Sequence, residues 1–257
     1  MIRQHHLQFG QDTLIRVLGL ATPLAFWEWA SQTERVNSVF LPPPSDVIPT
    51  ALDLLFTGTL NEHINVTLQQ VGVSLAGTIL VGVVLGVVIS RSKLIAQLAE
   101  PLVYAIIAAP NIAFVGIFIA LFGLGSEAVI AQGFVGGFPY VAINAATGMR
   151  QVDSTLVRVG QVFGATGWKM ALKILIPSAI PPIVAGIRLA IPRVVNGVIA
   201  GQLFAGAVGL GYQLAFYGNY LDTKEMYGVV VWLAVLGVTA NFAFSAVESR
   251  FASWQDR

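Results

Sequence analysis

Apolar residues run through most of the chain in long stretches that contain no Asp, Glu, Lys or Arg. Five such stretches lie between Glu62 and Arg91, Glu100 and Glu127, Glu127 and Arg150, Arg193 and Asp222, and Glu225 and Glu248. A helix crosses the hydrocarbon core of a bilayer with about 20 apolar residues. With the apolar segment Thr13 to Trp29, the pattern predicts about six membrane-spanning helices.

The predicted spans set the organisation of the chain. Residues 1–12 form a polar N-terminal segment, and residues 13–257 form one transmembrane domain of an all-α integral membrane protein. Pro110 lies inside the third span, and a proline within a helix removes a hydrogen bond and clashes with the preceding turn. We therefore expect a broken or kinked helix there. The predicted helices cover residues 13–31, 64–90, 98–122, 127–149, 178–205 and 226–249.

Composition supports a membrane protein. Hydrophobic residues make up 56% of the 257 residues and charged residues 11%, whereas soluble domains carry roughly 25% charged residues. A net charge of +1 without a basic run gives no indication of nucleic-acid binding. The chain has no cysteine and three scattered histidines, His5, His6 and His63, so we predict neither a metal site nor a cofactor. The polar start lacks the features of a cleaved signal peptide, which favours a retained first helix.

The distribution of Lys and Arg predicts the orientation, because cytoplasmic loops carry an excess of both. With the N-terminus inside, ten of these residues are cytoplasmic, and only Arg35 and Lys224 are outside. An even number of helices then returns the C-terminus to the cytoplasm. The ten are Arg3, Arg16, Arg91, Lys93, Arg150, Arg158, Lys169, Lys173, Arg250 and Arg257.

Small residues spaced four apart let helices approach closely in lipid. The chain has three such glycine pairs: Gly82 and Gly86, Gly133 and Gly137, and Gly197 and Gly201. Packing within one bundle is the favoured interpretation of each pair, and a seam between two copies of the chain is the alternative.

A proline-rich segment follows the first predicted span. Leu41-Pro-Pro-Pro-Ser-Asp-Val47 predicts an extended entry into a short helix, for which Ser45 or Asp46 is a candidate N-cap. The run from Ile48 to Phe56 that follows is amphipathic. Glu28, between two tryptophans, is interpreted as an anchor at the membrane interface.

The stretch of residues 150–177 between the fourth and fifth spans is too long for a simple turn. Its apolar residues recur at helical spacing, which predicts one or two short amphipathic helices with a break at Gly164. On amphipathicity alone, a helix lying on the lipid surface is the favoured interpretation. The residues that carry this pattern are Leu156, Val159, Val162, Phe163, Trp168, Ala171 and Leu172.

The spacing within this stretch resembles the signature loop of ABC importer permeases, in which Glu-Ala-Ala is followed by Gly and then by Ile-x-Leu-Pro. Gly164, Ile174 and Pro177 match at the required spacing. The run from Gly164 through Ala165 and Thr166 to Trp168 is similar to a Gly-Ala-Ser-x-Trp run of one branch of that family. Arg158 stands where the family has Glu, and Val159 and Gly160 replace the two alanines.

The resemblance implies a type I importer permease fold with a cytoplasmic coupling helix between helices 4 and 5. The loop would dock into a cleft of a separate ATPase and move with it, Gly164 allowing a turn and Pro177 starting the next membrane helix. The implied coupling residues are Leu156, Arg158, Val159, Gly160, Phe163, Gly164, Ala165, Thr166, Trp168 and Pro177. The implied partners are a second permease copy, two cytoplasmic ATPases and a periplasmic or lipid-anchored binding protein.

Short runs resemble a narrower group of permeases, those for nitrate, sulfonates, taurine and related solutes. They are Leu41 to Val47, Gly206-Ala-Val-Gly-Leu-Gly211 and Tyr220-Leu-Asp-Thr223. The resemblance implies a bacterial inner-membrane importer of a small anionic solute, with nitrate, bicarbonate, sulfonates, taurine and organic acids all open. The chain is not predicted to be an enzyme, since it lacks the Gly-x-x-x-x-Gly-Lys-Ser/Thr phosphate-binding loop.

Ionisable groups inside the membrane tend to mark function. Arg193 follows Pro192 deep in the fifth span, and we expect it to line the translocation path and to favour an anion. Arg188 is interpreted as a side chain that reaches the membrane surface. Further candidates for the path are Asn111, Asn144, Asn196 and Gln202, although each alone is more typical of an interhelical hydrogen bond.

Two other classes of protein remain as alternatives. One is a secondary carrier or channel working without an ATPase. Two inverted repeats with matching broken helices would favour it, and Pro110 and Pro192 are the only hint of such repeats. A membrane-embedded enzyme would need an acid/base cluster, and the sequence shows no such arrangement.

Overall fold

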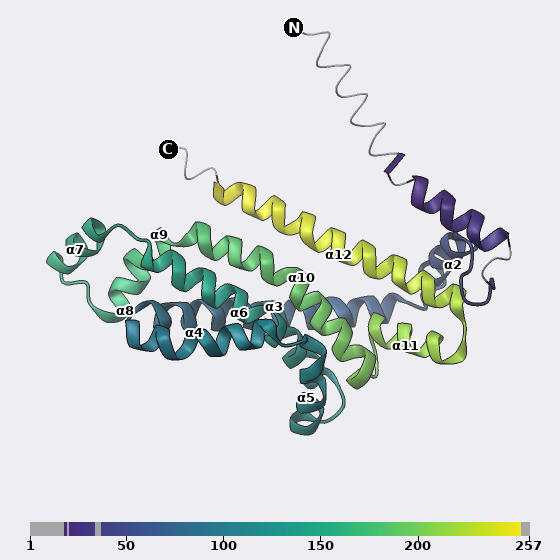
Figure 1. Ribbon diagram of the computed structural model, residues 1–257, viewed down its shortest axis with the longest axis horizontal. Helices are drawn as coiled ribbons and strands as arrows, with labels where there is room; N and C mark the ends of the chain where they lie inside the picture. Colours follow the sequence, from purple (N-terminus) through teal and green to yellow (C-terminus); the bar gives the residue numbers. More distant parts are fainter. Residues whose placement is uncertain (1–17, 20, 34–36, 253–257) are drawn as a thin grey trace, which may run out of the picture. The chain divides into compact units, whose positions relative to one another are not determined.

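A computed structural model of the chain describes residues 18–19, 21–33 and 37–252. Every regular element in these ranges is helical, as the all-α prediction required (Figure 1). The chain divides into two compact units, one of residues up to Thr59 together with Leu214–Trp232, and one of Leu60–Gln213 together with the residues from Leu233.

The larger unit contains most of the helices. They are α3 (Asn61–Ser90), α4 (Lys93–Ala108), the 3₁₀ turn η1 (Asn111–Phe114), α5 (Val115–Phe122), α6 (Ser126–Arg150), α7 (Ser154–Val162), α8 (Gly167–Met170), the π-helical turn η2 (Ala171–Leu175), α9 (Ile176–Ser178) and α10 (Ile180–Ala205). The helices α11 (Leu210–Tyr220) and α12 (Thr223–Ala252) follow.

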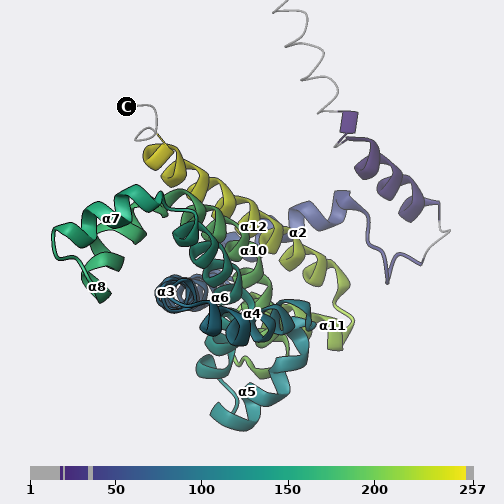
Figure 2. The ribbon, with the colours of Figure 1, turned by 60° about the vertical axis from the view of Figure 1, so that its left-hand side comes forward.

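Helix α6 forms the centre of this unit, with α3 along one side and α10 along another (Figure 2). Three buried polar side chains of α3, each four residues after the last, donate hydrogen bonds to α6. Gln70 donates to Ser126 Oγ, Ser74 to the Ile130 carbonyl and Thr78 to the Phe134 carbonyl. Since both partners advance by four residues at each step, α3 and α6 run parallel and in register.

The three glycine pairs lie at these helix contacts. An added Cβ would fall 2.5–2.9 Å from an atom of a neighbouring helix at every one of the six positions, which is too close for any other residue. Packing within the bundle is therefore confirmed for all three pairs. The neighbours are Val141 for Gly82, Ala145 for Gly86, Val198 for Gly133, Val194 for Gly137, Gln132 for Gly197 and Val129 for Gly201.

The third predicted span is broken at Pro110. Helix α4 ends at Ala108, and the helical chain resumes at Asn111 after a bend of 103°. The break at this proline is confirmed, and its physical reason is the missing amide of Pro110 together with the extended backbone of Ala109.

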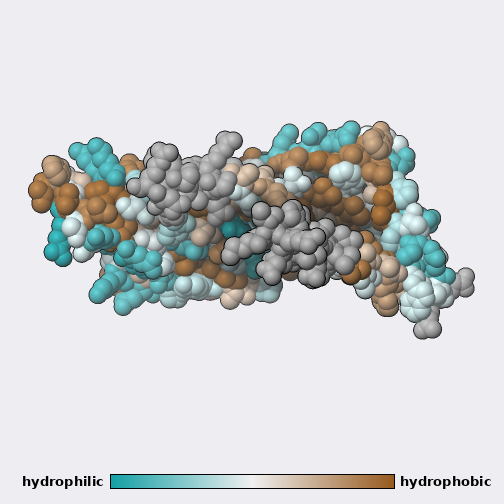
Figure 3. Space-filling view, turned by 90° about the horizontal axis from the view of Figure 1, so that it is seen from above, coloured by the Kyte–Doolittle hydropathy of each residue, from teal (hydrophilic) through white to brown (hydrophobic). Residues whose placement is uncertain are grey.

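Four helices of the described residues are long and apolar enough to cross a membrane, and the bent pair gives a fifth candidate. The four are α3, α6, α10 and residues Thr223–Ala246 of α12. The face shown in Figure 3 carries apolar areas that polar residues interrupt. Of the predicted first span, residues 13–17 and 20 lie outside the described residues, and residues 21–32 are helical.

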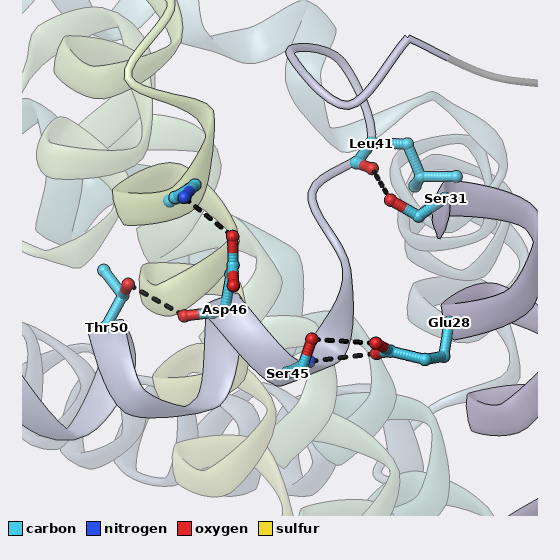
Figure 4. A network of polar contacts seen from close by, with 7 residues as sticks. Glu28, Ser31, Leu41, Ser45, Asp46 and Thr50 are labelled. Carbon is cyan, nitrogen blue, oxygen red and sulfur yellow. Dashed lines mark hydrogen bonds and ion pairs between the residues drawn. The ribbon is translucent and has the colours of Figure 1, made fainter. Parts of the chain in front are cut away.

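The smaller unit joins residues 21–32, α2 (Pro44–Phe56) and the start of α12 through polar contacts (Figure 4). Helix α2 begins at Pro44 after Pro43, without a side-chain cap, so the expectation that Ser45 or Asp46 caps it is wrong. Proline at the first helical position fixes the backbone there. Ser45 instead donates to Glu28 from its amide (3.0 Å) and its hydroxyl (2.8 Å), and Asp46 pairs with Lys224 at 2.7 Å.

Replacing Gly86 by valine is expected to destabilise the bundle, because a Cβ there would lie 2.5 Å from Ala145 Cβ. Overpacking of this kind costs about 1–3 kcal/mol. The measurement is the thermal midpoint of the purified protein in one detergent. Gly72 is the matched control, since it lies on the same helix with nothing within 4 Å of an added Cβ. Equal losses in Gly86→Val and Gly72→Val would contradict the close packing.

Candidate functional site

A cavity of about 270 Å³ lies beside the break at Pro110, between the end of α4, η1, α6 and α10. Arg193 of α10 and Tyr140 of α6 face it, with the Arg193 guanidinium carbon 5.5 Å from the centre of the Tyr140 ring. A guanidinium at this distance from an aromatic face is held by a cation–π interaction. Asn111, the first residue after the break, lines the same cavity.

Gln132, which is fully buried in α6, fixes the position of Asn111. Its side-chain amide donates to the backbone carbonyl and to the side-chain oxygen of Asn111, both at 2.6 Å. Gly136 and Gly197 make room, since an added Cβ would lie 2.5 and 3.0 Å from Asn111 Nδ2. The bend at Pro110 is thus held by one glutamine and two glycines.

Of the five residues predicted for a translocation path, the structure brings Asn111 and Arg193 to one cavity. Asn144 donates to the Tyr140 carbonyl within α6 at 2.8 Å. Asn196 is exposed and lines a separate cleft of about 440 Å³ between α10 and α12. Gln202 is fully buried.

Gln202 belongs to a buried hydrogen-bond network at the end of α10. Its amide donates to Thr67 Oγ1 (3.0 Å) and Gln70 Oε1 (2.7 Å) of α3. Its oxygen accepts from the Gly211 amide at 2.8 Å. These bonds join the first turn of α11 to α3 and α10. An interhelical hydrogen bond is the role typical of a lone intramembrane amide.

Three residues that make these contacts, Gln132, Tyr140 and Thr67, were not among the candidates predicted from the sequence. Gln132 carries a visible signal, since it is a polar residue within an otherwise apolar span. Tyr140 carries none, because tyrosine is common in membrane helices and its proximity to Arg193 depends on how α6 and α10 pack.

The stretch of residues 150–177 forms α7, α8, η2 and α9, which extend from the end of the bundle (Figures 1 and 2). Helix α7 is capped by Asp153, which accepts from the Thr155 amide at 2.7 Å. This backbone hydrogen bond lowers the pKa of the Asp153 carboxyl. Gly160 faces Ile174 and Met170 so closely that an added Cβ would lie 2.1 Å from Ile174 Cδ1.

The break at Gly164 is found as predicted. Helix α7 ends at Val162, Gly164 has φ +75°, and α8 begins at Gly167 with φ +54°. Positive φ values favour glycine. Pro177 lies in α9, before α10 begins at Ile180. It therefore does not start the long helix, whose first turn instead contains Pro181.

Six of the ten predicted coupling residues line one groove of about 520 Å³ between α7 and η2. They are Leu156, Val159, Gly160, Phe163, Gly164 and Ala165. Arg158, Thr166, Trp168 and Pro177 are exposed but do not line it. Lys169 and Lys173, which the prediction omitted, add positive charge to the groove.

A family model described as the inner membrane component of binding-protein-dependent transport systems matches residues 78–255. The chain belongs to this family. It is a multi-pass membrane protein and the permease type of subunit, which agrees with the resemblance found in the signature loop.

Curated relatives cover most of the chain. The taurine transport system permease protein of Escherichia coli is 23% identical over 91% of this chain and 87% of its own length. A putative aliphatic sulfonates transport permease of Bacillus subtilis is 24% identical over 93% and 87%. The formylaminopyrimidine transport permease of Halalkalibacterium halodurans is 24% identical over 89% and 92%.

Solved structures share the fold. A chain of the inward-facing MetNI methionine ABC transporter matches with a TM-score of 0.65 and 22% identity, over 75% of this chain and 95% of that chain. A chain of a bacterial ABC transporter that imports the acidic polysaccharide alginate matches with a TM-score of 0.64 and 14% identity, over 97% of both. The type I importer permease fold of the prediction is thereby confirmed.

Replacing Gln202 by leucine is expected to lower stability, because Thr67, Gln70 and the Gly211 amide would each lose a buried partner. An unsatisfied buried polar group costs about 1–3 kcal/mol. The thermal midpoint is the measurement, with Asn196→Leu on the exposed face of the same helix as control. A fall in stability for both variants alike would argue against the network.

Proposed function

We propose that the chain forms the translocation path for a small anionic solute in an ATP-driven importer. The observation that carries this is the placement of Arg193 at the cavity beside the Pro110 break. A guanidinium always carries its charge, and within a span it favours an anion in its vicinity. Nitrate, bicarbonate, sulfonates, taurine and organic acids all fit that description.

The names of the relatives support an anionic group on the solute. Two of the curated permeases are named for taurine and for aliphatic sulfonates, and both kinds of compound carry a sulfonate. A planar guanidinium fork suits an oxyanion, because it donates two parallel hydrogen bonds. The Asn111 and Tyr140 side chains at the same cavity are the polar groups that would complete the contact.

The importer that we propose contains a second copy of this permease, two cytoplasmic ATPases and a periplasmic or lipid-anchored binding protein. The exposed position of Arg193 and Asn196 on α10 supports a second permease. Intramembrane polar side chains face protein or water rather than lipid, so another chain is expected to cover this face. Both termini are placed in the cytoplasm on the Lys and Arg distribution.

The loop from α7 to η2 is proposed to dock into the ATPase. Val162 and Phe163 are 84% and 85% exposed, and such apolar anchors suit a groove of a partner. The charges of this loop beyond its cap are all positive, namely Arg158, Lys169 and Lys173. We therefore expect carboxylates around the groove of this chain's ATPase. An ATPase whose permease has Glu in place of Arg158 would not need them.

A secondary carrier or channel would work without an ATPase. The separating experiment is affinity purification of the tagged permease, expressed from its own gene cluster, with the ATPase identified by mass spectrometry. Recovery of an ATPase whose activity rises with the binding protein supports the importer, and transport by the permease alone in vesicles contradicts it.

Replacing Arg193 by glutamine is expected to reduce uptake at least tenfold, because the path loses its positive field, whereas Arg193→Lys is expected to retain a larger share. The measurement is uptake of radiolabelled taurine, sulfonate, nitrate and bicarbonate into vesicles containing the whole importer. Arg188→Gln, on the same helix but outside the cavity, is the control. Unchanged uptake in both Arg193 variants, for a solute that the wild type carries, would contradict the role.

Replacing Gly164 by valine is expected to uncouple ATP hydrolysis from transport while the chain still inserts in the membrane. The reason is backbone conformation, since Gly164 has φ +75° and open space around it. Asparagine tolerates this region far better than a β-branched residue, so Gly164→Asn is the matched control. ATPase and uptake rates of the assembled importer are compared. Wild-type coupling in Gly164→Val would rule out a role of this turn in coupling.

A further inference from the structure

Helix α2 presents three different faces. Val47, Ala51 and Leu54 are buried against the rest of its unit. Asp46, Thr50 and Asp53 lie on a polar face. The third face carries Ile48, Leu52 and Phe56, which are 51%, 46% and 81% exposed. These three residues are four apart, so they form one apolar stripe along the helix, here called the α2 stripe.

The buried face of α2 packs on the first three turns of α12. Trp232 donates from its indole nitrogen to the Ala51 carbonyl at 2.8 Å. An added Cβ at Gly228 would lie 3.3 Å from Ala51 Cα and 3.2 Å from Leu54 Cδ1. At the other end, Asp46 pairs with Lys224. Three separate contacts therefore fix α2 against residues 224–232.

These contacts set the depth of α2 in the membrane. Residues Thr223–Ala246 of α12 are a candidate span, and its charged start, Lys224 and Glu225, belongs in the polar headgroup region. From Lys224 to Trp232 the helix rises roughly 12 Å at 1.5 Å per residue. Because the interfacial zone of each leaflet is about 5–8 Å deep, α2 lies across the boundary between headgroups and hydrocarbon.

Aromatic side chains around α2 agree with this depth. The rings of Trp27 and Tyr227 are 5.6 Å apart, and the Tyr227 hydroxyl donates to the Phe40 carbonyl at 3.4 Å. Trp and Tyr are enriched at both membrane–water interfaces. With Trp232, three such residues from residues 21–32 and α12 gather in the same unit.

We infer that α2 is an interfacial helix whose stripe of Ile48, Leu52 and Phe56 inserts into the acyl chains of the leaflet in which α12 begins. Lipid is favoured over a protein partner because the depth from the α12 contacts places the stripe at the hydrocarbon boundary. The polar face with Asp53 then points to headgroups and water, as in other interfacial amphipathic helices. The ion pair of Asp46 with Lys224 holds the helix at that level.

The absence of cysteine from the sequence makes the inference directly testable. Single cysteines at Leu52, Phe56 and Asp53 are spin-labelled in the full-length permease, assembled with its partner subunits in phosphatidylcholine vesicles. Electron paramagnetic resonance then measures the collision of each label with oxygen, which partitions into lipid, and with a water-soluble nickel chelate. Asp53, exposed and adjacent to Leu52 in sequence, is the matched control.

We expect the oxygen-to-nickel accessibility ratio to be severalfold higher at Leu52 and Phe56 than at Asp53. Equal nickel access at all three positions would place the stripe in water and overturn the inference. Labels at Leu52 and Phe56 that are immobile and shielded from both reagents would show a protein covering the stripe, and would overturn it equally. Because the readout needs only insertion in the bilayer, it does not depend on which solute is carried or on coupling to the ATPase.

Discussion

The close approach of α6 to α3 and α10 is the constraint on which the rest of the larger unit depends. Lipid gives helices no hydrophobic reason to associate, so contact must come from fitted surfaces and interhelical hydrogen bonds. On the α3 side, Gln70, Ser74 and Thr78 donate to α6 at successive turns, and glycines continue the contact. On the α10 side, three glycines face valines of the neighbouring helix, and Gly197 faces the Gln132 carbonyl. Any side chain in place of these glycines would push the helices apart.

The same approach builds the cavity at Arg193. Asn111 fits where it does because Gly136 and Gly197 leave space between α6 and α10, and because Gln132 holds both of its oxygens. Pro110 breaks the preceding helix, so the chain can turn toward that space. A change that widened the α6–α10 contact would therefore move the bend and the cavity wall together. The packing of α6 against α10 and the geometry of the cavity at Arg193 therefore depend on each other.

Much of this architecture follows from the sequence, for reasons that differ by element. Charge-free stretches reveal spans because a charge in hydrocarbon is costly, and Pro110 and Gly164 reveal breaks through backbone chemistry alone. It is harder to predict which side of a membrane helix a polar residue lies on. A helix that is apolar all round has no polar face that would indicate how the helix is oriented. Three polar residues of α10 illustrate this. Arg193 lines a cavity, Asn196 lines an open cleft, and Gln202 belongs to a buried hydrogen-bond network. Likewise, Ser45 and Asp46 are good caps by type, but their side chains are engaged by Glu28 and Lys224 from distant parts of the chain.

The loop that carries the family signature has residues that set its shape and residues that only a partner would contact. Gly160 and Gly164 serve geometry: one allows α7 to touch Ile174, and the other turns the chain with a positive φ. Arg158 serves neither, since it is exposed, and in the part of the chain that the structure describes no salt bridge holds it. A reversal of charge at this position therefore leaves the shape of the loop intact and changes only what a partner meets. Under the docking that we propose, Arg158 would bear on which ATPase fits and not on how the loop folds.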